Sequence, residues 1–174
     1  PSYIYLASGN FNTKLIVENS SQCSDTIIRT VKVAISPAAD FNAKSVCFGE
    51  QVIFTNNSKP LGAKIISNTW DFNDGTNSSN DNPTHMYLTP KVYNVSLVVK
   101  DSSGCSDTLN RLIAVNKLPV ANFNFSIGCL GLNTSFSDTT IPLGVITVRK
   151  CDFGDGSSIN NIQNPTHKYN TANV

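Results

Sequence analysis

The feature that most constrains the fold is a residue motif that recurs along the chain. Residues 70–75 read Trp-Asp-Phe-Asn-Asp-Gly, and residues 151–156 read Cys-Asp-Phe-Gly-Asp-Gly. A second block follows each copy, Asn-Pro-Thr-His-Met-Tyr at 82–87 and Asn-Pro-Thr-His-Lys-Tyr at 164–169. Self-similarity of this kind is the signature of a repeat architecture.

The period of the repeat is 82 residues, because residues 1–35 align with 83–117 and residues 37–62 align with 119–144. The chain therefore begins in the last third of one unit (1–35), holds one whole unit (36–117) and ends two-thirds of the way through another (118–174). A unit of this size needs all its strands to close a core. We expect either that the sequence is a segment of a longer array, or that another chain completes the ends.

The residue pattern within the whole unit predicts an all-β fold. Apolar residues alternate with polar ones, most clearly at Tyr93, Val95, Leu97 and Val99, and such alternation is typical of half-buried strands. Hydrophobic residues make up 40% of the chain, which is enough to build a core. Short strands between Asn-, Gly- and Pro-rich turns predict a two-sheet sandwich, with strands at 38–42, 51–56, 66–72, 84–88, 93–99 and 108–115. Tyr93 is a candidate tyrosine corner.

Charge and hydropathy argue against two classes of partner. The formal net charge is only +1, so no strong field would attract nucleic acid or an anionic membrane surface. No apolar run approaches the roughly 18 residues needed to cross a bilayer. We therefore predict no nucleic-acid partner and no membrane insertion in this segment.

The Asp-Phe-x-Asp-Gly block has three interpretations. It contains the Asp-Phe-Gly of protein kinases in its second copy, but the other kinase motifs are missing. The oxygen-bearing side chains of Asp71, Asn73 and Asp74 could ligate calcium, although the spacing and terminal Glu of an EF-hand are missing. We favour a structural turn, in which Asp and Asn cap the backbone and Gly75 adopts a positive φ.

The two histidines offer little for catalysis or metal binding. His85 and His167 occupy equivalent positions, and neither has a second histidine nearby in the sequence. A metal site or a general base needs partners at short spacing. We interpret each as a strand histidine hydrogen-bonded between sheets, and we predict no catalytic residue, no metal and no cofactor.

Four of the five cysteines occupy two periodic positions, Cys47 and Cys129 in one and Cys23 and Cys105 in the other. In an exported chain this pattern indicates a disulfide framework. One candidate bridge, Cys47–Cys105, lies within the whole unit. The alternative is a bridge between neighbouring units of an array, whose partners lie outside this chain. The fifth, Cys151, is expected to be an unpaired core thiol.

Together these motifs resemble the PKD (polycystic kidney disease) domain. The resemblance rests on Trp-Asp-Phe-x-Asp-Gly, Asn-Pro-x-His-x-Tyr and Tyr-x-Val-x-Leu-x-Val-x-Asp, in that order. It implies tandem immunoglobulin-like sandwiches of about 82 residues, cut here as a C-terminal part (1–35), a complete unit (36–117) and an N-terminal part (118–174). Two departures are Cys151 in place of a tryptophan and Asn73 in place of a glycine. The signature residues are Trp70, Asp71, Phe72, Asp74, Gly75, Pro83, His85 and Tyr87, with Asp152, Phe153, Asp155, Gly156, Pro165, His167 and Tyr169 in the other copy.

The resemblance also implies a location and a role. The units look like those of large repetitive bacterial surface proteins, including gliding adhesins, so we expect an extracellular, cell-surface protein. Its partners would be neighbouring repeats or other copies of the same protein. Our first hypothesis is a non-catalytic spacer of a surface filament or adhesin. The alternative is a glycan- or protein-binding module of a secreted protein.

Overall fold

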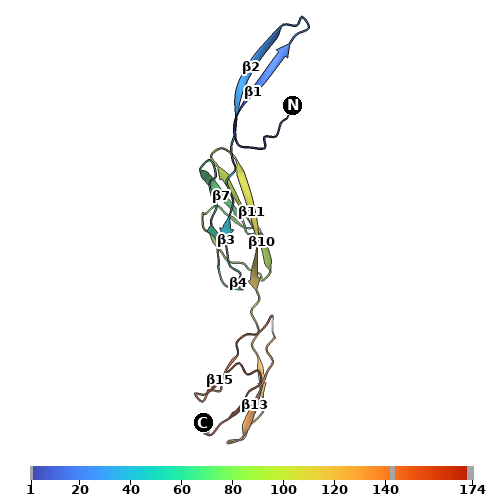
Figure 1. The fold of residues 1–174 in the computed structure, drawn as a ribbon. Coiled ribbons are helices and arrows are strands. Elements are labelled where there is room, and N and C mark those ends of the chain that lie inside the picture. The colour runs from blue at the N-terminus through green and yellow to red at the C-terminus, as the bar shows by residue number, and fades with distance from the viewer. Residues whose placement is uncertain (1, 142–143, 172–174) are drawn as a thin grey trace. The chain divides into compact units, whose positions relative to one another are not determined.

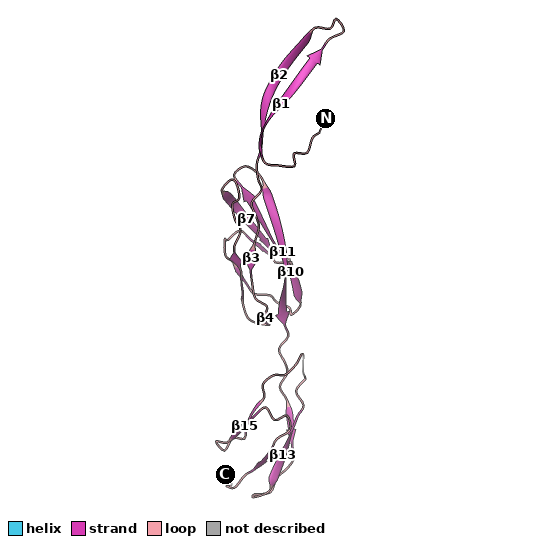
Figure 2. Ribbon diagram, in the orientation of Figure 1, coloured by secondary structure: helices cyan, strands magenta, loops and turns pink. Residues whose placement is uncertain are grey.

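The computed structural model describes residues 2–141 and 144–171. This part of the chain forms strands, turns and loops (Figure 2), and it contains no helix that could span a membrane. The predicted all-β class is confirmed. The chain divides into two compact units, Pro1–Asn116 and Lys117–Val174, which are described one at a time.

The first unit contains eleven strands, labelled in Figure 1 where there is room. Residues 36–116 form a sandwich whose larger sheet has the order β4-β11-β10-β7-β8. The pairs β3–β6 and β5–β9 make the opposing layer. The bounds are β1 Gly9–Glu18, β2 Ser24–Val33, β3 Phe41–Asn42, β4 Val46–Cys47, β5 Val52–Ile53, β6 Thr55–Asn56, β7 Ile65–Asp71, β8 Asn77–Ser78, β9 Thr84–His85, β10 Val92–Asp101 and β11 Ser106–Asn116.

The core of this sandwich lies between the two layers and is rich in aromatic rings. Trp70 on β7 is fully buried, and its ring centroid lies 5.1 Å from Phe41 and 5.4 Å from Phe54. The alternating residues of β10 point into the same core, as predicted; Val95, Leu97 and Val99 are all fully buried. Burying such side chains contributes about 1.5–3 kcal/mol each, so β10 and β11 are essential to this core.

Two details differ from the sequence-based expectation. The strand expected at 51–56 is interrupted, because β5 pairs with β9 while β6 pairs with β3. Between them the amide of Phe54 donates to the carbonyl oxygen of Pro83 at 3.0 Å. Ile66 has the same parity as Asn68 and Trp70 in the expected strand, which would place it on the buried face, but it is 61% exposed. The β7–β10 register shifts between Lys100 and Asp101, and an irregularity of this kind reverses the inward and outward alternation.

Residues 9–33 form a separate two-stranded hairpin, β1–β2. Its turn is the same as that between β10 and β11: Asn19 Oδ1 accepts bonds from the amides of Ser21 and Cys23. Asp101 Oδ1 accepts bonds from the amides of Ser103 and Cys105 in the same way. The hairpin is therefore built locally, by the same rules as its repeat counterpart.

The second unit repeats the opening part of the sandwich. Its strands are β12 Phe123–Phe125, β13 Asn133–Asp138, β14 Lys150–Asp152, β15 Ser158–Asn160 and β16 Thr166–Lys168. They pair as β12-β13-β16 and β14-β15. The pairing of Thr134 with His167 corresponds to that of Val52 with His85, 82 residues earlier. The repeat seen in the sequence is thus also a repeat in hydrogen bonding.

Candidate functional site

The turn that follows β7 is built from its own side chains. The amide of Asn73 donates to Asp71 Oδ1 at 2.8 Å, and the amide of Thr76 donates to Asp74 Oδ1 at 3.0 Å. Asn73 has φ 62° and Gly75 has φ 91°, a region favourable to glycine and tolerated by asparagine. The counterpart of Asn73 is Gly154, with φ 80°, which explains why the two residues exchange between copies.

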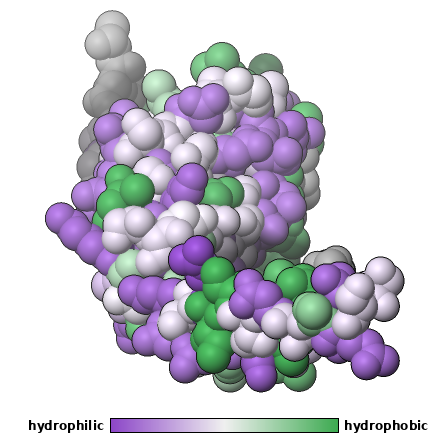
Figure 3. All heavy atoms as spheres, turned by 90° about the horizontal axis from the view of Figure 1, so that it is seen from above, coloured by the Kyte–Doolittle hydropathy of each residue, from purple (hydrophilic) through white to green (hydrophobic). Residues whose placement is uncertain are grey.

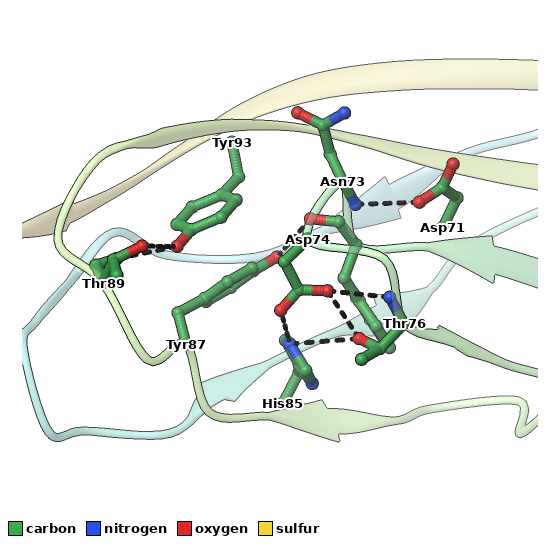
Figure 4. Close-up of polar contacts among 9 residues, drawn as sticks. Asp71, Asn73, Asp74, Thr76, His85, Tyr87, Thr89 and Tyr93 are labelled. Carbon is green, nitrogen blue, oxygen red and sulfur yellow. Dashed lines mark hydrogen bonds and ion pairs between the residues drawn. The ribbon is translucent and has the colours of Figure 1, made fainter.

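A histidine from the opposing layer joins this turn (Figure 4). His85 Nε2 lies 2.6 Å from Asp74 Oδ2, and the hydroxyl of Thr76 donates to Asp74 Oδ1 at 2.6 Å. The imidazole stacks on Phe72 with a centroid separation of 4.2 Å and an interplanar angle of 3°. We call Asp74, Thr76 and His85 the Asp–His clasp; it links the end of β7 to β9, in agreement with a histidine bonded between sheets.

The second unit contains the same clasp. His167 Nε2 lies 2.7 Å from Asp155 Oδ2, and the Ser157 hydroxyl donates to Asp155 Oδ1 at 2.5 Å. His167 stacks on Phe153 at 4.2 Å. The same contacts form in both units although the neighbouring residues differ. The clasp is therefore a feature of the repeated fold and not of one unit.

Electrostatics at the clasp favour an ionised carboxylate. Burial alone would raise the pKa of Asp74, but hydrogen bonds from Thr76 and His85 outweigh it and hold the pKa below its usual value. In the other copy, hydrogen bonds from Ser157 and then His167 lower the pKa of Asp155. Each carboxylate therefore stays charged under ordinary conditions, which strengthens the bonds that it accepts.

The geometry of the clasp is unsuited to nucleophilic catalysis. In a Ser–His–Asp triad the hydroxyl and the carboxylate bind opposite nitrogens of the histidine. Here the hydroxyl of Thr76 and the carboxylate of Asp74 meet the same nitrogen, at 3.5 and 2.6 Å, and the hydroxyl donates to the carboxylate. The carboxylate oxygens are occupied within the turn. The described residues also contain no cluster of three His, Cys, Asp or Glu side chains arranged to hold a metal.

Tyrosines extend the polar contacts beyond the clasp. The hydroxyl of Tyr87 donates to the carbonyl oxygen of Phe72 at 3.2 Å, and burial, with Asp74 nearby, raises the pKa of that hydroxyl. Tyr169 makes the same bond to Phe153 at 3.1 Å. Tyr93 donates to the carbonyl oxygen of Thr89 at 2.7 Å, which is the bond expected of a tyrosine corner.

The other signature residues lie around this turn and support the same layers. Trp70 and Phe72 are buried beneath it, and the indole of Trp70 donates to the carbonyl oxygen of Asn80 at 2.9 Å. Pro83 and its counterpart Pro165 supply carbonyl oxygens to the amides of Phe54 and Phe136. Asp152 and Gly156 repeat the roles of Asp71 and Gly75 in the second turn; the amide of Gly154 donates to Asp152 at 3.0 Å, and Gly156 has φ 87°.

All five cysteines are free in the structure, and Cys47 and Cys105, one of the two pairings considered from the sequence, do not form a bridge. Cys47 lies beside Asn116, at the end of β11, whereas Cys105 precedes the start of that strand. The ten steps from Ser106 to Asn116 span about 33 Å at roughly 3.3 Å per residue. A disulfide needs Cα atoms within about 7 Å. Cys23, Cys47 and Cys129 are exposed, and Cys105 and Cys151 are half-buried.

Two buried polar groups are not anticipated from the sequence. Asn68 is 9% exposed; it donates to Asp81 and accepts a bond from Asn56 at 3.2 Å. Asp101 is fully buried at the β10–β11 turn. The signal for Asp101 is present in the repeat, because Asn19 stands 82 residues earlier and caps the same turn.

Comparison with known proteins identifies a family for part of the chain. A family model described as PKD domain matches residues 34–115. A microbial collagenase of Vibrio alginolyticus is 39% identical over 71 residues, covering 40% of this chain and 9% of that protein. The pre-pro-metalloprotease PrtV of Vibrio cholerae is 34% identical over 116 residues, covering 63% of this chain and 12% of that protein.

Among solved structures, the PKD1 domain of Vibrio anguillarum Epp is similar, with 32% identity and a TM-score of 0.46. The match covers 49% of this chain and 99% of that domain. The chain spans only 9% of the length of the collagenase and 12% of the length of PrtV. Residues 34–115 of this chain, with their sandwich of β3 to β11, are a PKD domain.

Proposed function

We propose that this chain is a non-catalytic structural segment of an extracellular bacterial protein, in which consecutive sandwiches act as spacers in a cell-surface filament or adhesin. Residues 1–35, 36–117 and 118–174 are then parts of three consecutive units. The signature residues of each unit hold its layers together, and the partners are neighbouring repeats or other copies of the protein. The collagenase and metalloprotease relatives support an extracellular location.

The observation that carries this proposal is the burial of the aromatic residues. Glycan-binding surfaces and small-molecule sites use accessible aromatic side chains. Seven aromatic residues lie between 36 and 116, and only Phe48, at 39%, is exposed. The remaining six are Phe41, Phe54, Trp70, Phe72, Tyr87 and Tyr93, and each is at most 2% exposed. These rings build the core, and Phe48 is the one aromatic ring left on the surface of residues 36–116.

The alternative is a glycan- or protein-binding module of a secreted protein. The observation that favours it is the kind of protein to which the two relatives belong, a microbial collagenase and a metalloprotease. In each of these the match is a small part of the protein, at 9% and 12%. Such a module would act by recognition at its loops or sheet surface.

A binding screen separates the two functions. The purified chain is applied to glycan and collagen-peptide arrays, beside an unrelated β-sandwich of similar charge. The spacer role predicts signals equal to those of the control protein. Saturable binding that a Phe48→Ala variant abolishes would support the binding module. Labelling of intact cells with antibodies against residues 36–116 tests the surface location, and labelling only after lysis would refute it.

A further inference from the structure

Gly62 lies in the loop between β6 and β7, where another part of the PKD domain approaches its backbone closely. A Cβ atom on Gly62 would lie 2.5 Å from Cγ2 of Ile35 and 3.2 Å from the carbonyl oxygen of the same residue. Gly62 is not among the glycines with a positive φ, so its backbone conformation alone does not call for glycine. The close approach of Ile35 is therefore what requires a residue without a side chain here.

Residues 35–39, which we call the entry segment, lead the chain into the PKD domain. The amide of Ala38 donates to the carbonyl oxygen of Lys59 at 2.9 Å, and the amide of Lys59 donates back to Ala38 at the same distance. The amide of Ala39 donates to Asp107 Oδ2 at 2.8 Å. These bonds attach the second half of the entry segment to β11 and to the loop between β6 and β7.

The first half of the entry segment is held by packing. Pro37 is buried; its ring fixes its own φ and disfavours the helical conformation for Ser36. Ile35 is 43% exposed, and its side chain and carbonyl oxygen both lie against Gly62. Apolar side chains lie among polar ones on the surface drawn in Figure 3, and a half-exposed isoleucine is ordinary on a protein surface. What distinguishes Ile35 is its contact with the backbone of a glycine.

This contact is particular to the PKD domain of residues 34–115 and is not a general requirement of the repeat. Lys117 stands 82 residues after Ile35, so a charged side chain replaces the apolar one. Gly144 stands 82 residues after Gly62 and has φ 137°. Backbone conformation is thus sufficient to favour glycine at position 144, whereas at position 62 the reason is the neighbouring isoleucine.

We propose that Ile35 and Gly62 form a lock that makes the entry segment a stiff part of the PKD domain. With the contact, the chain is held from Ile35 onward; without it, the chain would be held only from Pro37 onward and could bend at Ser36. The lock deepens the proposed spacer role and rests on it for its purpose, because a spacer keeps its ends apart only if its junctions resist bending. The stiffness itself is measurable wherever the protein is located, so failure of the lock and failure of the surface role are distinguishable.

Backbone amide relaxation of the whole chain, measured by NMR, tests the lock. In the unmodified protein, the amides of Ile35 and Ser36 should have order parameters of about 0.85, like those of β10. Gly62→Ala should lower both to below about 0.6, because the added Cβ displaces Ile35. The matched control is Leu61→Ala in the same loop; its side chain is 54% exposed, and both order parameters should stay unchanged.

A second substitution, at Ile35, separates a steric lock from a general weakening of the domain. Ile35→Ala removes Cγ2 and leaves a gap beside Gly62, so alone it should also lower the order parameters. When Ile35→Ala is combined with Gly62→Ala, the two Cβ atoms would lie 3.8 Å apart, which is ordinary van der Waals contact. We therefore expect the double variant to recover order parameters of about 0.85, a non-additive result that a weakened domain would not give.

Order parameters below about 0.6 at Ile35 and Ser36 in the unmodified protein would overturn the lock, because the segment would already be flexible. Unchanged values in Gly62→Ala, or an equal fall in Leu61→Ala, would show that the contact does not hold the segment. A double variant no more ordered than Gly62→Ala would refute the steric pairing. Unchanged fluorescence of Trp70, the only tryptophan, verifies that each variant keeps its PKD domain. If Gly62→Ala fails this check, Ile35→Ala still tests the lock, since unchanged order at Ser36 would refute it.

Discussion

Replacement of Asp74 by asparagine tests the structural role of the Asp–His clasp. The side chains of Asp74 and His85 are 19% and 16% exposed and approach to 2.6 Å. A hydrogen bond to a charged group contributes about 1.5–3 kcal/mol, and a neutral one about 1. The amide oxygen of the substituted asparagine can still accept the bonds from Thr76 at the position of Oδ1. Its NH2 group replaces Oδ2 and cannot accept a bond from His85, so the charged contact with the imidazole is lost. We therefore expect Asp74→Asn to lower the free energy of unfolding by about 1–2 kcal/mol.

Trp70 provides the assay, because it is the only tryptophan in the chain and is fully buried in the PKD domain. Its fluorescence follows urea unfolding of that domain alone. With a slope of about 1 kcal/mol per molar urea, the midpoint should fall by about 1–2 M. Asp155→Asn changes the same clasp in the other unit and serves as the matched control. An unchanged midpoint in Asp74→Asn would refute the reasoning.

The Asp74→Asn variant also tests how the stability contributed by Asp74 depends on pH. The folded protein lowers the pKa of Asp74 below its usual value of 3.8. The carboxylate therefore stabilises the fold fully above the pKa of the unfolded chain, and this contribution is lost as pH falls through the folded pKa. The difference in stability between unmodified protein and Asp74→Asn should be constant near neutrality and shrink below about pH 4. A difference that grows in acid would contradict this sign.

The remaining predictions concern the turn, the tyrosine and the cysteines. Gly75→Ala should lower the free energy of unfolding in urea by about 1–2 kcal/mol, because an alanine is strained at the φ of 91° that Gly75 adopts. No atom lies within 4 Å of the added Cβ, so the loss measures backbone strain and not a steric clash. An unchanged free energy of unfolding would contradict the strain argument. Tyr87→Phe leaves the carbonyl oxygen of Phe72 without its donor and should cost about 1 kcal/mol, whereas a stabilised variant would count against that bond. Peptide mapping without reductant should give no peptide joining Cys47 to Cys105, and its recovery would overturn the placement of these residues at opposite ends of β11.

The strands and the core are predictable because they depend on local alternation and on the repeat. The alternation of Tyr93, Val95, Leu97 and Val99 predicts one face of a strand, and all four are buried on β10. The turn at Asn73 and Gly75 is predictable from side-chain chemistry alone, since few residues tolerate a positive φ.

The features that are not predictable depend on where distant strands meet. The sequence predicts that Asp74 caps a turn and that His85 bonds between sheets, but their mutual bond requires the turn after β7 to lie against β9. The exposure of Ile66 depends on an irregularity in the β7–β10 pairing. The two cysteine pairings considered from the sequence could not be separated by spacing alone. The structure shows that Cys47 lies beside Asn116 and that Cys105 precedes Ser106, at opposite ends of an 11-residue strand.

Hydrogen exchange tests most directly the central claim, that residues 36–116 form one closed sandwich held together by its aromatic core. Amides in β7, β10 and β11 should exchange only through unfolding of the PKD domain, because they belong to a closed core. Amides in the exposed turns of the same domain should exchange at least about a hundredfold faster. Exchange of the β7, β10 and β11 amides as fast as that of the exposed turns would contradict the claim.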